Sequence, residues 1–285
     1  MKNKKKAAGA GHSPDSLKYL MKELRQLGDA HYENVKRAPA SVREAYEECV
    51  ASSNSSGAGD GGLEGENEDA ILQLSESIWL RTNARKITKF TALMRGVDDP
   101  YEGGFYCFDI SIPPEYPFKP PEFKFLTCLQ TSININPNLY GDCGKVCLSI
   151  LGTFPGPSWT SAMSLESVCR QIQALLVPNP LENEPGYGPK EDKMDKMTGM
   201  DMESSLGMPI APATPGKGKG EDMYDKYKQA VRHANLRIAV VRMLTRPPTQ
   251  TCRQFLPLMR ALFARDASKM IAFARMHASK NPESR

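Results

Sequence analysis

The sequence predicts an α+β fold, in which an antiparallel meander of about four strands packs with helices. Two observations predict it. Four short runs rich in β-branched and aromatic residues follow one another between residues 71 and 129, separated by turn signals such as Asp98-Asp99-Pro100 and Pro113-Pro114. Segments with apolar residues at helical spacing lie before and after these runs. Such an order suits a sheet with helices packed on it.

Each predicted helix has its own signals. Ser13 suits an N-cap, Pro14 the first helical position and Gly28 the stop, which predicts a helix over 14–28. Apolar stripes predict further helices at about 165–176, 222–245 and 252–278, with a short one at 41–51. The apolar stripe of the first helix consists of Leu17, Leu20, Met21, Leu24 and Leu27.

These elements divide the chain into a core and less ordered parts. We expect a disordered basic tail over 1–13, a core over 14–245 and a C-terminal helical extension over 246–285. Gly, Ser and acidic residues predict a flexible insertion at about 30–76. Charged, Met-rich and Pro/Gly-rich sequence predicts a linker at about 189–221.

Composition excludes several classes of protein. The net charge of +4 is too small to indicate a nucleic-acid partner, and no apolar run is long enough to span a membrane. Seven cysteines without a CxxC pattern favour free thiols over a disulfide framework. The four histidines form no ligand-like cluster with cysteines, so we expect no metal and no cofactor. These features favour the cytoplasm or the nucleus.

An irregular stretch over 131–161 carries the candidate chemistry. It is dense in Asn, Gly, Pro, Ser and Thr, and long irregular stretches inside compact domains are often functional. Within it, Cys147 lies in the apolar run GKVCLSILGT, with no histidine within a hundred residues before it. By itself such a cysteine is typical of a buried core thiol.

The order of motifs around Cys147 resembles the ubiquitin-conjugating (E2) enzyme family and, within it, the class of E2 Z and BRUCE. The motifs are YEGGF (101–105), YPFKPP (116–121), NPN (136–138), GKVCLSILGT (144–153), GPSW (156–159), NEPGY (183–187) and VRHANLRIAV (231–240). The resemblance covers roughly 14–28 and 77–245. It implies the UBC (E2) fold, here with a C-terminal helical extension.

The resemblance also implies an acyl-transfer reaction. Cys147 would accept ubiquitin or a ubiquitin-like protein as a thioester from an E1 activating enzyme and pass it to lysine of a protein substrate, with or without an E3 ligase. Exchange between two thiols is nearly balanced and uses a thiolate, so no histidine base is required. The partners implied are therefore the modifier, an E1, an E3 and protein substrates, with no nucleic acid and no membrane.

The resemblance assigns Asn138 as the second catalytic residue. Its amide suits either an oxyanion donor or a holder of the active-site loop, while an Asx turn beside Pro137 is the structural alternative. Asn138 precedes Cys147 by nine residues instead of the family's usual eight. Asn136 stands where most family members have histidine, and we interpret it as loop scaffolding.

Three further groups are implied by position. A gate that orients the incoming lysine falls on Asn183 or Glu182, depending on the reference motif, and helix-end capping is the alternative. Lys18, Lys22 and Arg25 lie off the apolar stripe of the first helix and would bind the E1, although a solvated charged face is equally consistent with them. The residues at the ligase-binding surface would be Phe118, Lys119 and Ser161; Ser161 departs from the family's usual proline.

Two other functions compete with the E2 enzyme. An inactive E2 variant would be a binding module, and loss of the active-site cysteine is its hallmark, whereas Cys147 is present. A cysteine hydrolase would need a base, and the candidate is His233, in a segment that matches a structural helix of the family.

Overall fold

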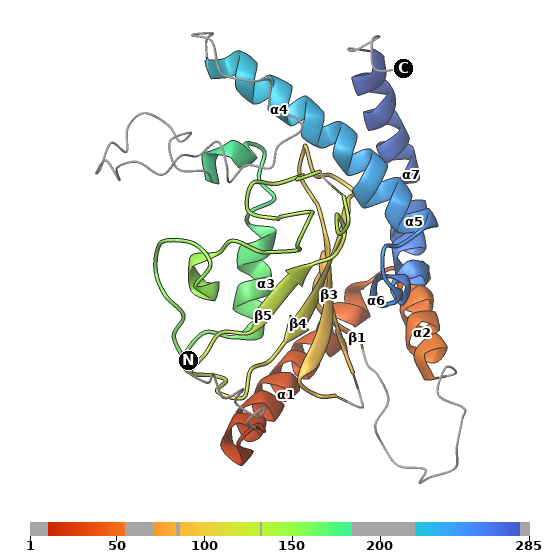
Figure 1. Ribbon diagram of the computed structural model, residues 1–285. Coiled ribbons are helices and arrows are strands. Elements are labelled where there is room, and N and C mark those ends of the chain that lie inside the picture. The colour runs from red at the N-terminus through yellow and green to blue at the C-terminus, as the bar shows by residue number, and fades with distance from the viewer. Residues whose placement is uncertain (1–10, 55–70, 84–85, 132, 184–219, 280–285) are drawn as a thin grey trace.

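A computed structural model describes residues 11–54, 71–83, 86–131, 133–183 and 220–279. Its centre is a five-stranded antiparallel sheet in the order β1-β2-β3-β4-β5, in which each strand pairs with its neighbour in sequence (Figure 1). The strands are β1 (Ile71–Ser75), β2 (Ile78–Thr82), β3 (Lys89–Arg95), β4 (Phe105–Ser111) and β5 (Glu122–Phe125). The predicted α+β class and antiparallel meander are confirmed, with one strand more than expected.

The additional strand arises because 71–81 forms a hairpin instead of one strand. Glu76 and Ser77 make the turn, and Ser77 N–H donates to Ser75 Oγ at 3.3 Å. The turn contains no glycine, asparagine or proline, which are the residues that announce a tight turn in a sequence. A serine side chain and the long-range hydrogen bond from Gln173 Nε2 to Ser77 Oγ at 2.7 Å stabilise it instead.

Side chains that alternate along the strands form two separate cores, one on each face of the sheet. On β4, Tyr106 and Phe108 face one core while Phe105 and Cys107 face the other. The first core also receives α1 (Pro14–Arg37), α3 (Leu165–Gln173) and most of α4 (Gly220–Ala234). The second core receives α2 (Ala40–Asn54), α6 (Gln250–Arg253) and α7 (Leu256–Ser279).

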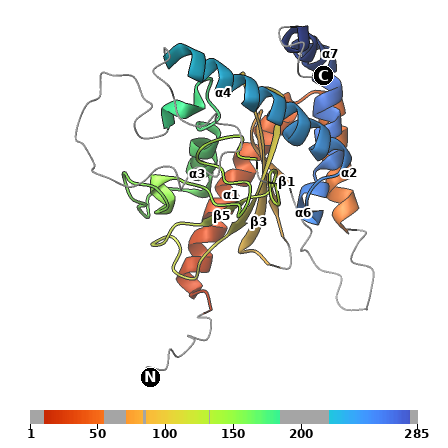
Figure 2. The same ribbon diagram turned by 45° about the horizontal axis from the view of Figure 1, so that its top comes forward.

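The C-terminal helices therefore form a layer of the fold. Figures 1 and 2 show α6 and α7 on the side of the sheet away from α3, with α2 beside α7. Leu258, Met259 and Leu262 of α7 pack with Trp79 of β2 and Leu93 of β3. The described part of the expected extension over 246–285 thus covers the second face of the sheet together with α2. None of the described helices is both long and apolar enough to cross a membrane.

Helix α1 does not end at Gly28 as predicted but continues to Arg37. The extra turns dock on β1, where Gln73 N–H donates to His31 Nδ1 at 2.8 Å and Asn34 Nδ2 donates to Gln73 O at 2.9 Å. A glycine inside a helix costs about 1 kcal/mol relative to alanine, and these tertiary contacts offset that cost. Local sequence alone could not reveal them.

The predicted flexible insertion at about 30–76 is wrong for its ends. Residues 30–54 belong to α1 and α2, and Val42 and Cys49 of α2 are buried in the second core. Residues 71–75 are a strand of the sheet. The middle of the expected insertion, residues 55–70, lies outside the described residues. So do residues 189–219 of the expected linker and residues 1–10 of the expected basic tail. From that tail, His12 contacts Ile112 O through Nε2 at 2.9 Å.

The predicted helix at 222–245 is observed as α4, a π-helical segment η5 (Asn235–Arg242) and the single turn α5 (Met243–Thr245). It is attached to β4 by a buried hydrogen bond and to the β3–β4 turn by partly buried ion pairs. Asn235 Oδ1 accepts from Tyr106 O–H at 2.5 Å, and Asp99 pairs with Lys228 at 3.0 Å and with Arg232 at 2.5 Å. These contacts hold the turn that carries Tyr101, which reaches the candidate site.

If α7 is a layer of the fold, truncating one of its core side chains must destabilise the whole domain. Leu258→Ala should lower the free energy of unfolding by about 2–5 kcal/mol, because it removes a fully buried leucine. Leu256→Ala, at a partly buried position on the same helix, should cost less. Urea unfolding followed by circular dichroism and by tryptophan fluorescence tests this. An unfolding of α7 separate from that of the sheet would contradict it.

Candidate active site

Cys147 lies on an extended run that continues the sheet at the edge of β5. Lys145 forms a bridge with Lys124 of β5, and Val146 forms a bridge with Leu139. Gly144 begins the run at φ +79°, where a Cβ would lie 2.7 Å from Phe125 O, so this turn requires glycine. The side chains of Val146 and Leu148 are buried on either side of Cys147. The cysteine is therefore presented by a backbone that is fixed on both sides.

Cys147 is buried, with 6% of the residue exposed. It takes no part in a disulfide, and neither does any other described cysteine. Cys143, four residues earlier, is exposed in the preceding turn. A buried core thiol would have apolar packing without a polar loop around it, whereas Cys147 lies against the Asn136–Asn138 turn.

Asn138 binds the backbone of Cys147 in both directions. Cys147 N–H donates to Asn138 O at 2.8 Å, and Asn138 Nδ2 donates to Cys147 O at 3.2 Å. Asn138 is buried, and among the described residues its Oδ1 has no hydrogen-bond partner. A buried polar atom without a partner is costly. The geometry supports the loop-holding role of Asn138, and the oxyanion role stays a prediction.

Asn136 holds the turn from beneath. It is fully buried, its Oδ1 accepts from Asn138 N–H at 2.9 Å, and its Nδ2 donates to Tyr101 Oη and to Leu175 O, each at 2.9 Å. The three hydrogen bonds of this side chain are all made to other buried groups of the protein, which fits the scaffolding role predicted for Asn136. Tyr101 lies in the YEGGF motif, but no role was predicted for it from the sequence. Burial raises the pKa of its hydroxyl well above the ordinary value, so it stays a neutral hydrogen-bonding group.

The predicted gate lies beside this turn. Asn183 ends the short helix η3 (Pro180–Asn183), and its Nδ2 donates to Leu175 O at 3.4 Å, the same carbonyl that Asn136 contacts. This bond fits the alternative of capping the turns after α3. The side chain of Glu182 lies outside what the structure describes. The role of either residue toward a lysine stays a prediction.

The residues of the expected ligase surface lie on neighbouring loops. Trp159 Nε1 donates to Pro117 O at 2.6 Å, which joins the loop of Phe118 and Lys119 to that of Ser161. Tyr19 O–H of α1 donates to Ser161 O at 3.0 Å. Phe118 is 82% exposed and therefore accessible to a partner, and its role at a ligase surface stays a prediction.

The predicted E1-binding residues of α1 are exposed. Lys18, Lys22 and Arg25 all face solvent, and Lys18 lies 3.8 Å from Asp15 in an exposed ion pair. Met21, which we placed on the apolar stripe, is instead 41% exposed. Its place in the core is taken by Glu23, which lies on the same helical face as Leu20 and Leu27.

Glu23 joins α1 to the segment of Tyr116 and to the start of α3, and the sequence predicted no such role for it. Its Oε2 accepts from Tyr116 O–H at 2.5 Å, and its Oε1 accepts from the N–H of Leu165, the first residue of α3. Burial raises the pKa of its carboxyl above the ordinary value of 4.5, although both hydrogen bonds act in the opposite direction. Its spacing of three from Leu20 and four from Leu27 was the signal that could have found it.

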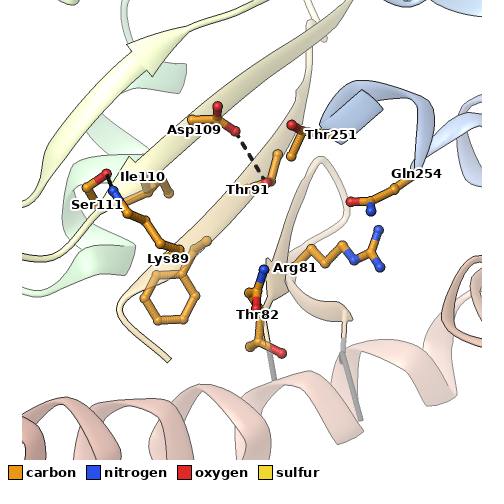
Figure 3. A pocket seen from close by; sticks show the side chains of 11 residues that line it. Arg81, Thr82, Lys89, Thr91, Asp109, Ile110, Ser111, Thr251 and Gln254 are labelled. Atoms are coloured by element: carbon orange, nitrogen blue, oxygen red, sulfur yellow. Dashed lines mark hydrogen bonds between the residues drawn. The ribbon is translucent and has the colours of Figure 1, made fainter. Parts of the chain in front are cut away.

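A separate polar cavity of about 290 Å³ lies between the ends of three strands and α6 (Figure 3). Arg81, Lys89 and Asp109 line it from the sheet, and Thr251 and Gln254 line it from the C-terminal helices. Its described lining includes none of the predicted site residues. The cavity is therefore distinct from the surroundings of Cys147.

Comparison with known proteins identifies a family match that includes this site. Residues 66–196 match the family model for ubiquitin-conjugating enzymes. This part of the chain belongs to the ubiquitin-conjugating enzyme family. The matched stretch of this E2 domain contains both Cys147 and Asn138, together with all five strands. The predicted family and the UBC fold are thereby confirmed.

The similar curated proteins support the predicted class within the E2 family. The chain is 39% identical over 159 residues to ubiquitin-conjugating enzyme E2 Z of Danio rerio, which covers 55% of this chain and 40% of that protein. The match to human E2 Z is 38% over 159 residues, covering 55% and 37%. The match to human BIRC6, a dual E2 ubiquitin-conjugating enzyme/E3 ubiquitin-protein ligase, is 39% over 122 residues, covering 41% and 2%. The chain thus spans about two fifths or less of these relatives.

The buried carboxyl of Glu23 should make the stability of this E2 domain depend on pH. Because its folded-state pKa is raised, its contribution is fully present below the ordinary value of 4.5 and is lost as pH rises through the folded-state pKa. Glu23→Gln should remove this loss, so its stability relative to the parent should increase as pH rises above 4.5. Urea unfolding at a series of pH values measures it.

Two further variants control this experiment. Glu23→Ala should cost about 1–3 kcal/mol relative to the parent at low pH, because it leaves buried donors unpaired. The cost should become smaller as pH rises above 4.5, because alanine also lacks the titrating carboxyl. Glu44→Gln, at an exposed position of α2, should follow the parent. A Glu23→Gln profile parallel to that of the parent would show that the carboxyl does not titrate as its burial requires.

Proposed function

We propose that this chain is an active E2 enzyme that carries ubiquitin or a ubiquitin-like protein on Cys147. The observation that carries the proposal is the position of Cys147 inside the matched E2 domain, with its backbone bound on both sides by Asn138. The E1 and E3 partners and the lysine acceptor are part of the same proposal.

In the first step, the thiolate of Cys147 attacks the carbonyl carbon of the modifier's thioester on the E1. The new carbon–sulfur bond forms as the old one breaks, and the E1 cysteine leaves as a thiolate. Since the bond broken and the bond formed are of the same kind, the step needs correct placement of Cys147 more than a strong base. This agrees with a site whose described contacts hold the backbone.

In the second step, a neutral lysine amine attacks the carbonyl of the Cys147 thioester. An isopeptide bond forms, the Cys147 thiolate leaves, and the amine loses a proton to solvent or to a gate residue. Negative charge develops on the carbonyl oxygen, and an amide N–H of Asn138 is suited to stabilise it. Because Asn138 already contacts the carbonyl of Cys147, it would act from the same loop that carries the thioester.

Cys147 and Asn138 should affect different steps. Cys147→Ala should abolish charging with E1, ATP and modifier, and Cys147→Ser should accumulate an oxyester that resists reductant. Asn138→Ala keeps the backbone hydrogen bond from Cys147 N–H to Asn138 O. It should therefore slow charging far less than discharge to free lysine, which should fall roughly 10²–10³-fold, as when an oxyanion donor is removed. Reducing and non-reducing gels of single-turnover reactions measure both steps.

Asn134→Ala is the matched control, because its amide accepts from Gly141 N–H in the same loop without contacting Cys147. It should discharge at the parent rate. A thioester on Cys147→Ala would refute the proposed nucleophile. Equal slowing of both steps in Asn138→Ala would leave Asn138 with the loop-holding role alone. Absence of charging in the parent with a panel of E1 enzymes would favour the inactive binding module.

Reversing the three exposed charges of α1 should slow charging without changing the fold. Lys18→Glu, Lys22→Glu and Arg25→Glu together should reduce the charging rate on the order of tenfold at low salt, and less at high salt, if they meet an acidic surface of the E1. Arg43→Glu, at an exposed position of α2, should charge normally. Equal rates for the triple variant and the parent at every salt concentration would leave these residues as a solvated face.

A further inference from the structure

The segment after Cys147 turns back on itself. A short helix, η2 (Ser149–Leu151), is followed by Gly152 in the left-handed conformation at φ 68°. This turn returns the chain to Leu148, where Thr153 N–H donates to Leu148 O at 3.2 Å. The side chain of Thr153 thereby lies against the backbone that carries the cysteine.

The hydroxyl of Thr153 binds the two peptide units that flank Cys147. It donates to Val146 O at 2.6 Å, and it accepts from Leu148 N–H at 3.0 Å. The first contact is to the carbonyl before Cys147, and the second is to the N–H after it. A single hydroxyl therefore holds both ends of this residue.

Together with Asn138, Thr153 completes the hydrogen bonding of this backbone. Asn138 binds the N–H and the C=O of Cys147 itself, and Thr153 binds the adjacent C=O and N–H. The neighbouring side chains, Val146 and Leu148, are anchored in the core. With the main chain held at four successive polar groups, the direction of the Cα–Cβ bond of Cys147 is set.

We propose that Thr153 is a positioning residue for Cys147, whose hydroxyl fixes the direction from which the thiol meets a thioester. Its catalytic consequence rests on the proposed E2 function. Reacting atoms must approach to about 3–3.5 Å with aligned orbitals, and small misplacements cost up to roughly a hundredfold in rate. Thr153 is exposed and is not part of the apolar core. Loss of its hydroxyl should therefore change the placement of Cys147 more than it changes the packing of the core.

Comparing Thr153→Val with Thr153→Ser separates the effect of the hydroxyl from the effect of the side chain's shape. Valine keeps the branched shape but cannot hydrogen-bond, and serine keeps the hydroxyl. We expect Thr153→Val to lower kcat for charging about tenfold or more with little change in KM for the E1, since α1 is untouched, while Thr153→Ser charges within about twofold of the parent. Thr249→Val, which removes a hydroxyl that caps α6, should leave charging unchanged.

A second measurement does not depend on E1. Alkylation of Cys147 by iodoacetamide, measured by peptide mass spectrometry relative to the exposed Cys143 in the same sample, reports how well the loop covers the thiol. Thr153→Val should alkylate Cys147 several-fold faster relative to Cys143, and Thr153→Ser should match the parent. Slower charging together with faster alkylation is the signature of a misplaced thiol, and a general loss of fold would also change the melting temperature.

The two measurements distinguish this inference from the proposed function. If the parent is never charged but Thr153→Val still raises the alkylation ratio, the E2 activity fails and the positioning role of Thr153 stands. If Thr153→Val has the parent's alkylation ratio and charging rate, the positioning role is wrong. It is also wrong if Thr153→Ser is impaired as strongly as Thr153→Val, because then the hydroxyl is not what matters. Thr153→Ala gives the same comparison if valine perturbs the loop.

Discussion

The alternation of side chains across the sheet is the constraint on which the rest of this structure depends. Trp79 and Leu80 are neighbours on β2 but belong to opposite cores, and the same holds along β3 and β4. Both faces of an antiparallel sheet must therefore be covered by helices, or large apolar side chains would be exposed to water. One layer comes from α1, α3 and α4, and the other from α2, α6 and α7. The three-layer architecture follows from this requirement.

The same sheet provides the base of the candidate active site. The extended run that carries Cys147 is joined to β5 by a β-bridge between Lys145 and Lys124. The edge of the sheet therefore holds this run in place, although the run is not a full strand. On this base, polar side chains replace the ladder hydrogen bonds that a strand would have. Asn136 and Asn138 hold one side of the run and Thr153 holds the other. A thiol that exchanges acyl groups needs such placement, because its chemistry requires little assistance from a base.

Helix α1 connects the surfaces of this E2 domain to one another. Its exposed face carries Lys18 and Lys22, while its buried face carries Glu23, which contacts Tyr116 and the start of α3. Tyr116 immediately precedes the loop that presents Phe118. Retaining a buried carboxyl here costs desolvation, which its hydrogen bonds to two other segments compensate in part. The orientation of α1 relative to the Phe118 loop is thus specified by polar contacts in addition to apolar packing.

The sequence by itself determined the antiparallel meander and the order of the helices around it, because these depend on local periodicity and turn residues. The motifs around Cys147 were found through their resemblance to the E2 family. The sequence could not determine where α1 ends, because the contacts of His31 and Asn34 with Gln73 that extend the helix come from a distant strand. The burial of Glu23, the hairpin at Ser77 and the docking of α7 on the second face of the sheet depend in the same way on segments far apart in the chain. Only the tertiary structure joined Tyr101 to Asn136 and Thr153 to the backbone around Cys147, because a hydrogen bond depends on distance in space, and separation in sequence does not report that distance.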